Sequence, residues 1–201
     1  MRRTFTPHNN DLGVWVCSVG LFPVFLFMQA ISDDKHAAHV DVKFGHIRQD
    51  RRKYFLKDQA LPFDCWDGGE IPASSNHWQL FMIGEEAGST FMEECDLGNL
   101  QFPVRMAGVI LIVDKEVIDV RRRAHFEFGW AINQGLPHVI AAFGYDKPEF
   151  SPETFCHQFG LDPMTPVVTG SALRWHEEPE VDPKFVKRVL EAMYRRIGTW
   201  S

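Results

Sequence analysis

The sequence has few cysteines, and they form no pattern that would pair them or bind a metal. The four lie far apart, at positions 17, 65, 95 and 156. There is no C-x-x-C motif and no histidine at metal-ligand spacing. This distribution excludes a zinc ribbon and a dense disulfide framework, and it favours a reducing compartment. We therefore expect a cytoplasmic protein without a metal site.

An excess of positive charge is also missing. The 201 residues carry 21 Lys and Arg against 27 Asp and Glu, which gives a formal net charge of -6. Such a chain offers no broad electrostatic footprint for nucleic acid or anionic lipid. We expect a protein or small-molecule partner, no nucleic acid and no membrane; the charge count leaves the oligomeric state open.

The chain lacks a Pro/Gly/Ser-rich linker long enough to divide it. A hydrophobic content of 45% is enough for one substantial core, so we expect a single domain over residues 1–201. The polar stretch at residues 60–76 is rich in Pro, Gly and Ser and predicts a loop insertion. Loops of that length are usually functional or disordered.

A nearly uncharged run covers residues 14–31 and follows Arg2 and Arg3. One interpretation is a signal peptide or a membrane span. Against it, Gly20 and Pro23 interrupt the run, the two arginines lie well ahead of it, and no small-residue cleavage site follows. The favoured interpretation is a buried strand at residues 14–19, a turn at 20–23 and a buried helix at 24–31.

Downstream, the hydrophobic pattern alternates between strands and helices. Residues 39–48 alternate like a half-buried strand, with residues 53–57 as a candidate hairpin partner. The other expected strands are residues 78–83, 107–113, 137–143 and 166–170, and the expected helices are residues 119–134, 151–159 and 183–197. This order predicts an α/β three-layer sandwich whose mostly parallel sheet has helices on both faces. Any site then lies at the carboxyl ends of the strands.

The carboxy-terminal half resembles the Ras-like small GTPases, especially the Sar-like and gliding-motility branch of bacteria and archaea. The resemblance is carried by F-S-P-E at 150–153, P-V-V at 166–168, S-A-L at 171–173 and F-V-K-R-V-L at 185–190. In that family, similar segments join the guanine motif to the last helix. Over residues 12–197 the resemblance implies a P-loop NTPase-type fold.

The phosphate loop of that family reads G-x-x-x-x-G-K-[ST]. The equivalent stretch here runs from Ser18, which stands in the place of the first Gly, and contains Gly20 inside the loop. It then has Pro23, Val24 and Phe25 in place of the second Gly, the Lys and the hydroxyl residue. Proline has no amide to donate, and valine brings no charge to the phosphates. The resemblance therefore implies a degenerate member without phosphate or magnesium binding, with no cofactor and no GTP hydrolysis.

The second switch motif, D-x-x-G, is half preserved. Glu85 replaces the Asp and is one methylene too long for the usual metal contact, whereas Gly88 is kept. At residues 38–39, where the first switch would supply a Thr, no hydroxyl is present. The switch-equivalent segments, residues 37–45 and 85–97, are the expected contact faces.

The guanine motifs are better kept. The N-K-x-D motif reads F-G-Y-D and retains Asp146, whose carboxylate would accept two hydrogen bonds from guanine. Ser171 and Ala172 fit the S-A-[KL] loop of the family. The simpler interpretation is that Asp146 starts a turn with Lys147 and Pro148.

A second resemblance is to nucleoside deoxyribosyltransferase-like proteins. It is carried by A-H-F-E-F-G-W-A at 124–131 and G-L-P-H-V-I at 135–140. A Glu is the nucleophile in that family, which implies this role for Glu127, with Asp114 as a second carboxylate. The alternative is that Glu127 is an ordinary solvated or ion-paired side chain.

Together these patterns predict a pseudo-GTPase that acts as a protein-binding regulatory or scaffold subunit. The resemblance implies roadblock-type regulators or other signalling or motility proteins as partners. The high content of aromatic residues, with 6 Trp and 17 Phe, is typical of a contact surface. Two alternatives stay open: an atypical switch that binds GTP or GDP with Mg²⁺, and a deoxyribosyltransferase-like enzyme.

Overall fold

The computed structural model describes residues 3–4, 6–7, 9–18, 21–31, 38–44, 59–71, 74–83, 100–115, 135–173 and 180–198. The strands are β1 (Arg3–Thr4), β2 (Asp11–Ser18), β3 (Ala38–Phe44), β4 (Gln59–Glu70), β5 (His77–Ile83), β6 (Leu100–Gln101), β7 (Arg105–Asp114), β8 (His138–Phe143) and β9 (Val167–Gly170). The helices are α1 (Leu21–Ile31), α4 (Pro152–Gln158) and α5 (Pro183–Gly198).

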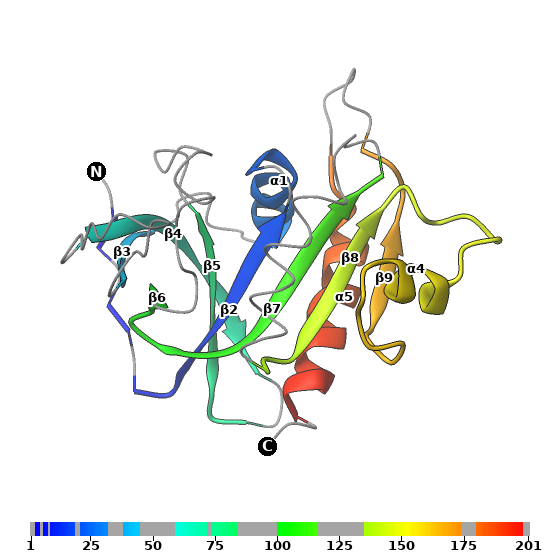
Figure 1. Ribbon diagram of the computed structural model, residues 1–201. Coiled ribbons are helices and arrows are strands. Elements are labelled where there is room, and N and C mark those ends of the chain that lie inside the picture. Colours follow the sequence, from blue (N-terminus) through cyan, green and yellow to red (C-terminus); the bar gives the residue numbers. More distant parts are fainter. Residues whose placement is uncertain are drawn as a thin grey trace, which may run out of the picture.

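The described strands form one sheet in the order β1-β3-β4-β5-β2-β7-β8-β9, and β6 pairs with β3 (Figure 1). β5, β2, β7, β8 and β9 run parallel to one another, whereas β4 runs antiparallel to its neighbours β3 and β5. β2 is the first of the parallel strands in the chain, and later strands lie on both sides of it. The strand order therefore reverses between β2 and β7, and open α/β sheets bind ligands at the carboxyl ends of the strands at such a point.

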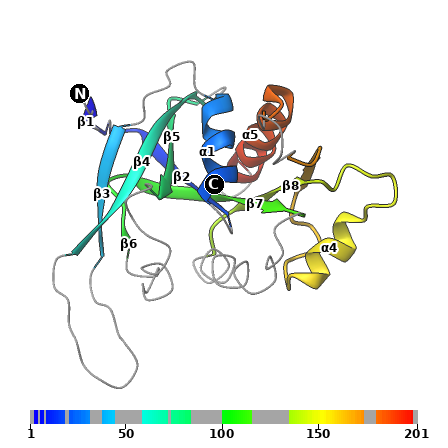
Figure 2. The same cartoon turned by 90° about the horizontal axis from the view of Figure 1, so that it is seen from above.

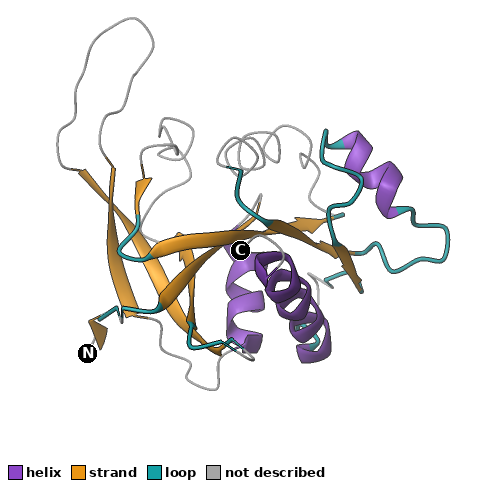
Figure 3. Ribbon diagram, turned by 90° about the horizontal axis from the view of Figure 1, so that it is seen from below, coloured by secondary structure: helices purple, strands orange, loops and turns teal. Residues whose placement is uncertain are grey.

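The helices cover both faces of the sheet. α1 and α5 lie side by side on one face, and α4 lies on the other face near β8 and β9 (Figures 2 and 3). This arrangement confirms the predicted α/β architecture with a mostly parallel sheet.

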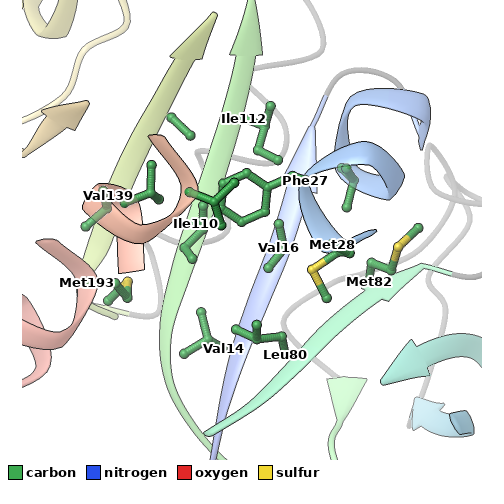
Figure 4. Packing of buried hydrophobic residues seen from close by; sticks show 14 of the residues in the cluster. Val14, Val16, Phe27, Met28, Leu80, Met82, Ile110, Ile112, Val139 and Met193 are labelled. Carbon is green, nitrogen blue, oxygen red and sulfur yellow. The ribbon is translucent and has the colours of Figure 1, made fainter. Parts of the chain in front are cut away.

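Side-chain alternation along the strands builds a core on each face. On the face of α1 and α5, alternate residues of the central strands pack beneath Phe27 and Met28 of α1 and Met193 of α5 (Figure 4). These strand residues are Val14, Val16, Leu80, Met82, Ile110 and Ile112. On the opposite face, Trp15 and Phe63 belong to a second cluster that also includes residues of α4. The uncharged character of residues 107–113 follows from burial on both faces.

Several sequence predictions match the observed elements within a few residues. They include β5, β7, β8, β9, α4 and α5. At α4, Ser151 is the N-cap, and its hydroxyl accepts a hydrogen bond of 3.2 Å from the Thr154 amide. Pro152 opens the helix, as expected from its fixed φ angle and its lack of an amide hydrogen.

The predicted loop insertion at residues 60–76 is wrong over most of its length, because β4 extends through Glu70. β4 is also the true hairpin partner of β3, with Ala38 opposite Cys65 and Phe44 opposite Gln59. The proposed partner strand at residues 53–57 lies outside the described residues.

The predicted start of the first helix is also wrong. α1 begins at Leu21, so Pro23 lies in its first turn, where a missing amide hydrogen costs little. Among the described residues, no helix is both long and apolar enough to cross a bilayer.

Candidate functional site

Asp146 and Ser171 meet at the carboxyl edge of the sheet. Asp146 follows β8 and Ser171 follows β9, and the Ser171 hydroxyl donates a hydrogen bond of 2.9 Å to Asp146 Oδ2. Both side chains are exposed. A carboxylate offers about four lone-pair sites, so Asp146 retains capacity to accept hydrogen bonds from a ligand. The structure thus brings together two residues that the sequence placed in one base-binding site.

A turn follows Asp146, so the simpler interpretation of this residue also holds in part. The Phe150 amide donates a hydrogen bond of 3.0 Å to the Lys147 carbonyl oxygen. The turn and the Ser171 contact are compatible, because the first uses the backbone and the second uses the Asp146 side chain.

Gly144 fixes the spacing of the strand ends around this pair. Its φ angle is +79°, a region in which residues with a Cβ are strained. Its amide donates a hydrogen bond of 2.8 Å to the Gly170 carbonyl oxygen. A Cβ at this position would lie 3.1 Å from Lys115 Cβ and 3.4 Å from Ala172 Cβ. Gly144 therefore lets the residues that follow β7, β8 and β9 approach closely.

Lys115 and Tyr145 lie at the same carboxyl edge of the sheet as Asp146 and Ser171, although no sequence motif assigns them a role. The Lys115 ammonium lies 5.7 Å from the centre of the Tyr145 ring, within cation–π range. Phe150 and Phe155 pack against Tyr145, with ring centres 5.3 and 5.2 Å away. The Lys115 position could have been noticed, because this residue directly follows a buried strand. This edge of the sheet therefore carries two contacting pairs, Ser171 with Asp146 and Lys115 with the half-buried ring of Tyr145.

Asp114 occupies the last position of β7, at the point where the strand order reverses. Its side chain is buried, with 3% exposure. In the β7–β8 register it lies opposite Phe143. Glu127, its proposed partner in the deoxyribosyltransferase-like reading, lies outside the described residues, and so do Glu85 and Gly88 of the second switch motif.

The residues assigned to a degenerate phosphate loop do not form a loop of the usual length. β2 ends at Ser18 and α1 begins at Leu21, so only residues 19 and 20 connect them, and the predicted Gly20 falls in this undescribed link. Pro23, Val24 and Phe25 all belong to the helix. Val24 is 3% exposed and lies in the apolar core. The position aligned with the phosphate-binding Lys is thus a buried hydrophobic residue.

A separate series of contacting polar side chains lies at the opposite, amino-terminal edge of β2 and β5. The Cys65 thiol contacts Gln79 Oε1 at 3.3 Å, Gln79 Nε2 contacts His77 Nδ1 at 3.2 Å, and His77 Nε2 contacts an Asp67 oxygen at 3.1 Å. Burial, with the nearby carboxylates of Asp11 and Asp67, raises the pKa of Cys65 far above that of a free thiol. A protonated thiol is a poor nucleophile, so this cluster has a structural character.

The described segments hold no group of three or more His, Cys, Asp and Glu residues arranged to bind a metal ion. Comparison with known proteins gave no match to any protein-family model and none to a curated protein.

Proposed function

We propose that this chain is a Ras-like domain that has lost binding of nucleoside triphosphate with Mg²⁺ and acts by contacting other proteins. The observation that carries the proposal is the direct passage from β2 into α1. A phosphate loop wraps its backbone amides around the phosphates before the helix begins. Here helix α1 starts at Leu21, after two connecting residues.

The chemistry of the first turn of α1 supports the same conclusion. Pro23 offers no amide hydrogen, and Val24 is packed into the apolar core beside the sheet. Neither residue compensates the negative charge of a triphosphate. Phe25, in the position of the magnesium-binding hydroxyl, has no side-chain oxygen. The sheet remains intact without these groups, because its stability comes from the buried strands.

Isothermal titration calorimetry with GTP and GDP tests the loss of binding, with Mg²⁺ present in one series and EDTA in a second. We expect no heat of binding up to about 100 μM nucleotide, which sets a ceiling of about 5.5 kcal/mol on any binding free energy. Micromolar, Mg²⁺-dependent binding of GTP would overturn the proposal.

Protein contact is the second part of the proposal. The resemblance to the gliding-motility branch points to roadblock-type regulators as partners, with residues 37–45 as one contact face. β3 covers most of that segment and lies toward the edge of the sheet. Size-exclusion chromatography with purified roadblock-type proteins should give a complex of defined stoichiometry. If no such protein co-elutes, the assignment of this partner class is wrong.

An atypical guanine-nucleotide switch is a second candidate, favoured by the Asp146–Ser171 hydrogen bond of 2.9 Å. Under this proposal, Asp146 reads the base and other cations replace the missing phosphate loop. The same calorimetry decides the matter: GTP binding that is lost in Asp146→Ala and kept in Glu149→Ala, a nearby exposed carboxylate, would support the switch.

A nucleoside-transforming enzyme is the third candidate, favoured by the buried position of Asp114 at the strand-order reversal. In this proposal, the Glu127 carboxylate attacks the sugar C1′ as the glycosidic bond breaks, and the departing base takes up a proton from solvent. Water or a second base then releases the sugar. Chromatography of 2′-deoxynucleosides incubated with the protein should show free base. That product should disappear in Glu127→Gln and Asp114→Asn and persist in Glu153→Gln, a control on the exposed side of α4.

A further inference from the structure

We propose that the outer face formed by α1 and α5 docks an acidic amphipathic helix of a partner protein. The inference rests on the proposed role of the domain in protein contact. It adds the surface and the chemistry of the partner.

The outward side of α5 is basic within an acidic protein. The helix carries five Lys or Arg residues and one Glu, whereas acidic residues outnumber basic ones over the whole chain. Lys184, Lys187, Arg188 and Arg195 are all exposed, and the exposed Glu191 lies among them. These positions recur every three or four residues or their multiples, so they lie on one side of the helix. We call these four residues the basic stripe.

α1 contributes an uncharged surface beside the basic stripe. It contains no charged residue, although a helix at a protein surface ordinarily carries charges on its outer side. Phe25 and Leu26 are partly buried hydrophobic residues near the exposed Gln29. α1 and α5 run side by side (Figure 2), and the Phe27 and Phe185 rings lie 6.5 Å apart between them. A basic surface and a partly exposed apolar surface are therefore adjacent on one face.

The distribution of charge over α1, α5 and the rest of the chain favours an acidic helix as the partner. An amphipathic helix can place its apolar side on α1 and its carboxylates on the basic stripe, which satisfies both surfaces at once. A nucleic acid or an anionic membrane extends well beyond one helix and meets the remaining, predominantly acidic surface, which repels it. A single acidic helix contacts only the complementary strip.

Fluorescence anisotropy provides the test, with the full chain and a fluorescein-labelled peptide of about 18 residues, long enough to form a helix. The peptide has Glu on one helical side and Leu on the other. A scrambled peptide of the same composition removes the amphipathic order. Lys184→Glu/Lys187→Glu reverses two charges of the basic stripe, and Arg105→Glu/Lys147→Glu reverses two exposed charges elsewhere. All four side chains are exposed, so both variants should fold.

We expect the ordered peptide to bind at least about fivefold more tightly than the scrambled one. The stripe variant should weaken binding by about tenfold, and the control variant by less than about twofold. Equal binding of the two peptides, or equal losses in the two variants, would overturn the proposal. The proposal would also be overturned if the protein sedimented with phosphatidylserine-containing vesicles and did not bind the peptide. Nucleotide binding is measured in a separate experiment, and its detection would overturn the proposed function. Failure of the docking proposal and failure of the proposed function are therefore distinguishable.

Discussion

The hydroxyl of Ser171 donates a hydrogen bond to Asp146 Oδ2 across 2.9 Å, and so links the segments that follow β8 and β9. The two residues are 25 positions apart in the chain. Because both side chains are exposed, the bond orders the carboxyl edge of the sheet more than it stabilises the whole fold.

Removing either side chain of the Ser171–Asp146 hydrogen bond should lower the free energy of unfolding slightly, and the two losses should not add. Ser171→Ala and Asp146→Ala should each lower the free energy of unfolding by no more than about 1 kcal/mol, the usual net worth of one hydrogen bond. The double variant should lose little more than the larger single loss, because both changes remove the same bond. Urea unfolding of the four proteins measures these values, and fully additive losses would show that the side chains act independently.

Gly108 should not tolerate a methyl group. An added Cβ would overlap Met193 Cε of α5 and approach the Pro137 carbonyl oxygen to 3.0 Å. The carbonyl cannot move freely, since it accepts a hydrogen bond of 2.9 Å from the Val109 amide. Gly108→Ala should therefore cost about 1–3 kcal/mol through overpacking.

Gly198→Ala is the matched control for that substitution. No atom lies within 4 Å of the added Cβ, and Gly198 is the last residue of α5. Its unfolding midpoint in urea should equal that of the unmodified chain or exceed it slightly, because alanine favours helix. A Gly108→Ala variant as stable as Gly198→Ala would contradict the close packing of α5 on β7.

Arg188 should protect the exposed edge of the sheet. Its guanidinium donates a hydrogen bond of 3.0 Å to the Thr169 carbonyl oxygen of β9, which has a neighbour on one side only among the described strands. Arg188→Ala should lower the free energy of unfolding by up to about 1 kcal/mol and leave an edge carbonyl open to other strands. Light scattering at rising protein concentration should detect self-association. Arg188→Lys retains a donor and should associate less.

The stability of the fold should fall at alkaline pH because of Cys65. Burial and the neighbouring carboxylates raise the pKa of this thiol, so the folded chain keeps a proton that the unfolded chain releases above a pH of about 8.5. The unfolded state then binds fewer protons, and the free energy of unfolding decreases as the pH rises above that value. Below it, this thiol gives no pH dependence.

Urea unfolding at several pH values between about 7.5 and about 10.5 checks this sign, since this range spans the ordinary thiol pKa. Cys65→Ala loses packing at every pH, but its stability should decline less steeply than that of the unmodified chain. The difference between the two curves isolates the thiol from lysines and tyrosines that titrate in the same range. Parallel curves would show that Cys65 does not contribute.

The uninterrupted apolar strands could be predicted from sequence because burial on both faces leaves a clear signature, as in β7 and β8. β4 was missed because Pro62, Gly68 and Gly69 suggest a loop. Pro62 is tolerated where β4 pairs with β3 alone, before its pairing with β5 starts at Phe63. Gly68 and Gly69 lie at a register shift opposite β5, and a Cβ on Gly68 would come within 2.9 Å of Trp78 Cβ. Pro62, Gly68 and Gly69, which are typical of loops, thus allow β4 to form an irregular strand.

The candidate site could be predicted only in part. Asp146 and Ser171 were found because each follows a strand and matches a motif with a chemical role. Lys115 and Tyr145 were not found, since their contact depends on the parallel pairing of β7 and β8 and on the φ angle of Gly144. The spacing of residues along the sequence does not predict the contact between Lys115 and Tyr145.

The central place of β2 also has a consequence for how the chain folds. β2 lies near the beginning of the sequence, yet its two neighbours in the sheet are β5 and β7, so the register that ends with Ser18 opposite Ile112 closes a separation of more than ninety residues. Contacts of such long range slow folding, because the entropy of closing the chain is lost before the ladder forms. During synthesis, the hydrophobic residues of β2 and α1 emerge long before β7 can cover them. This amino-terminal region is therefore a segment of the nascent chain that would benefit from a chaperone.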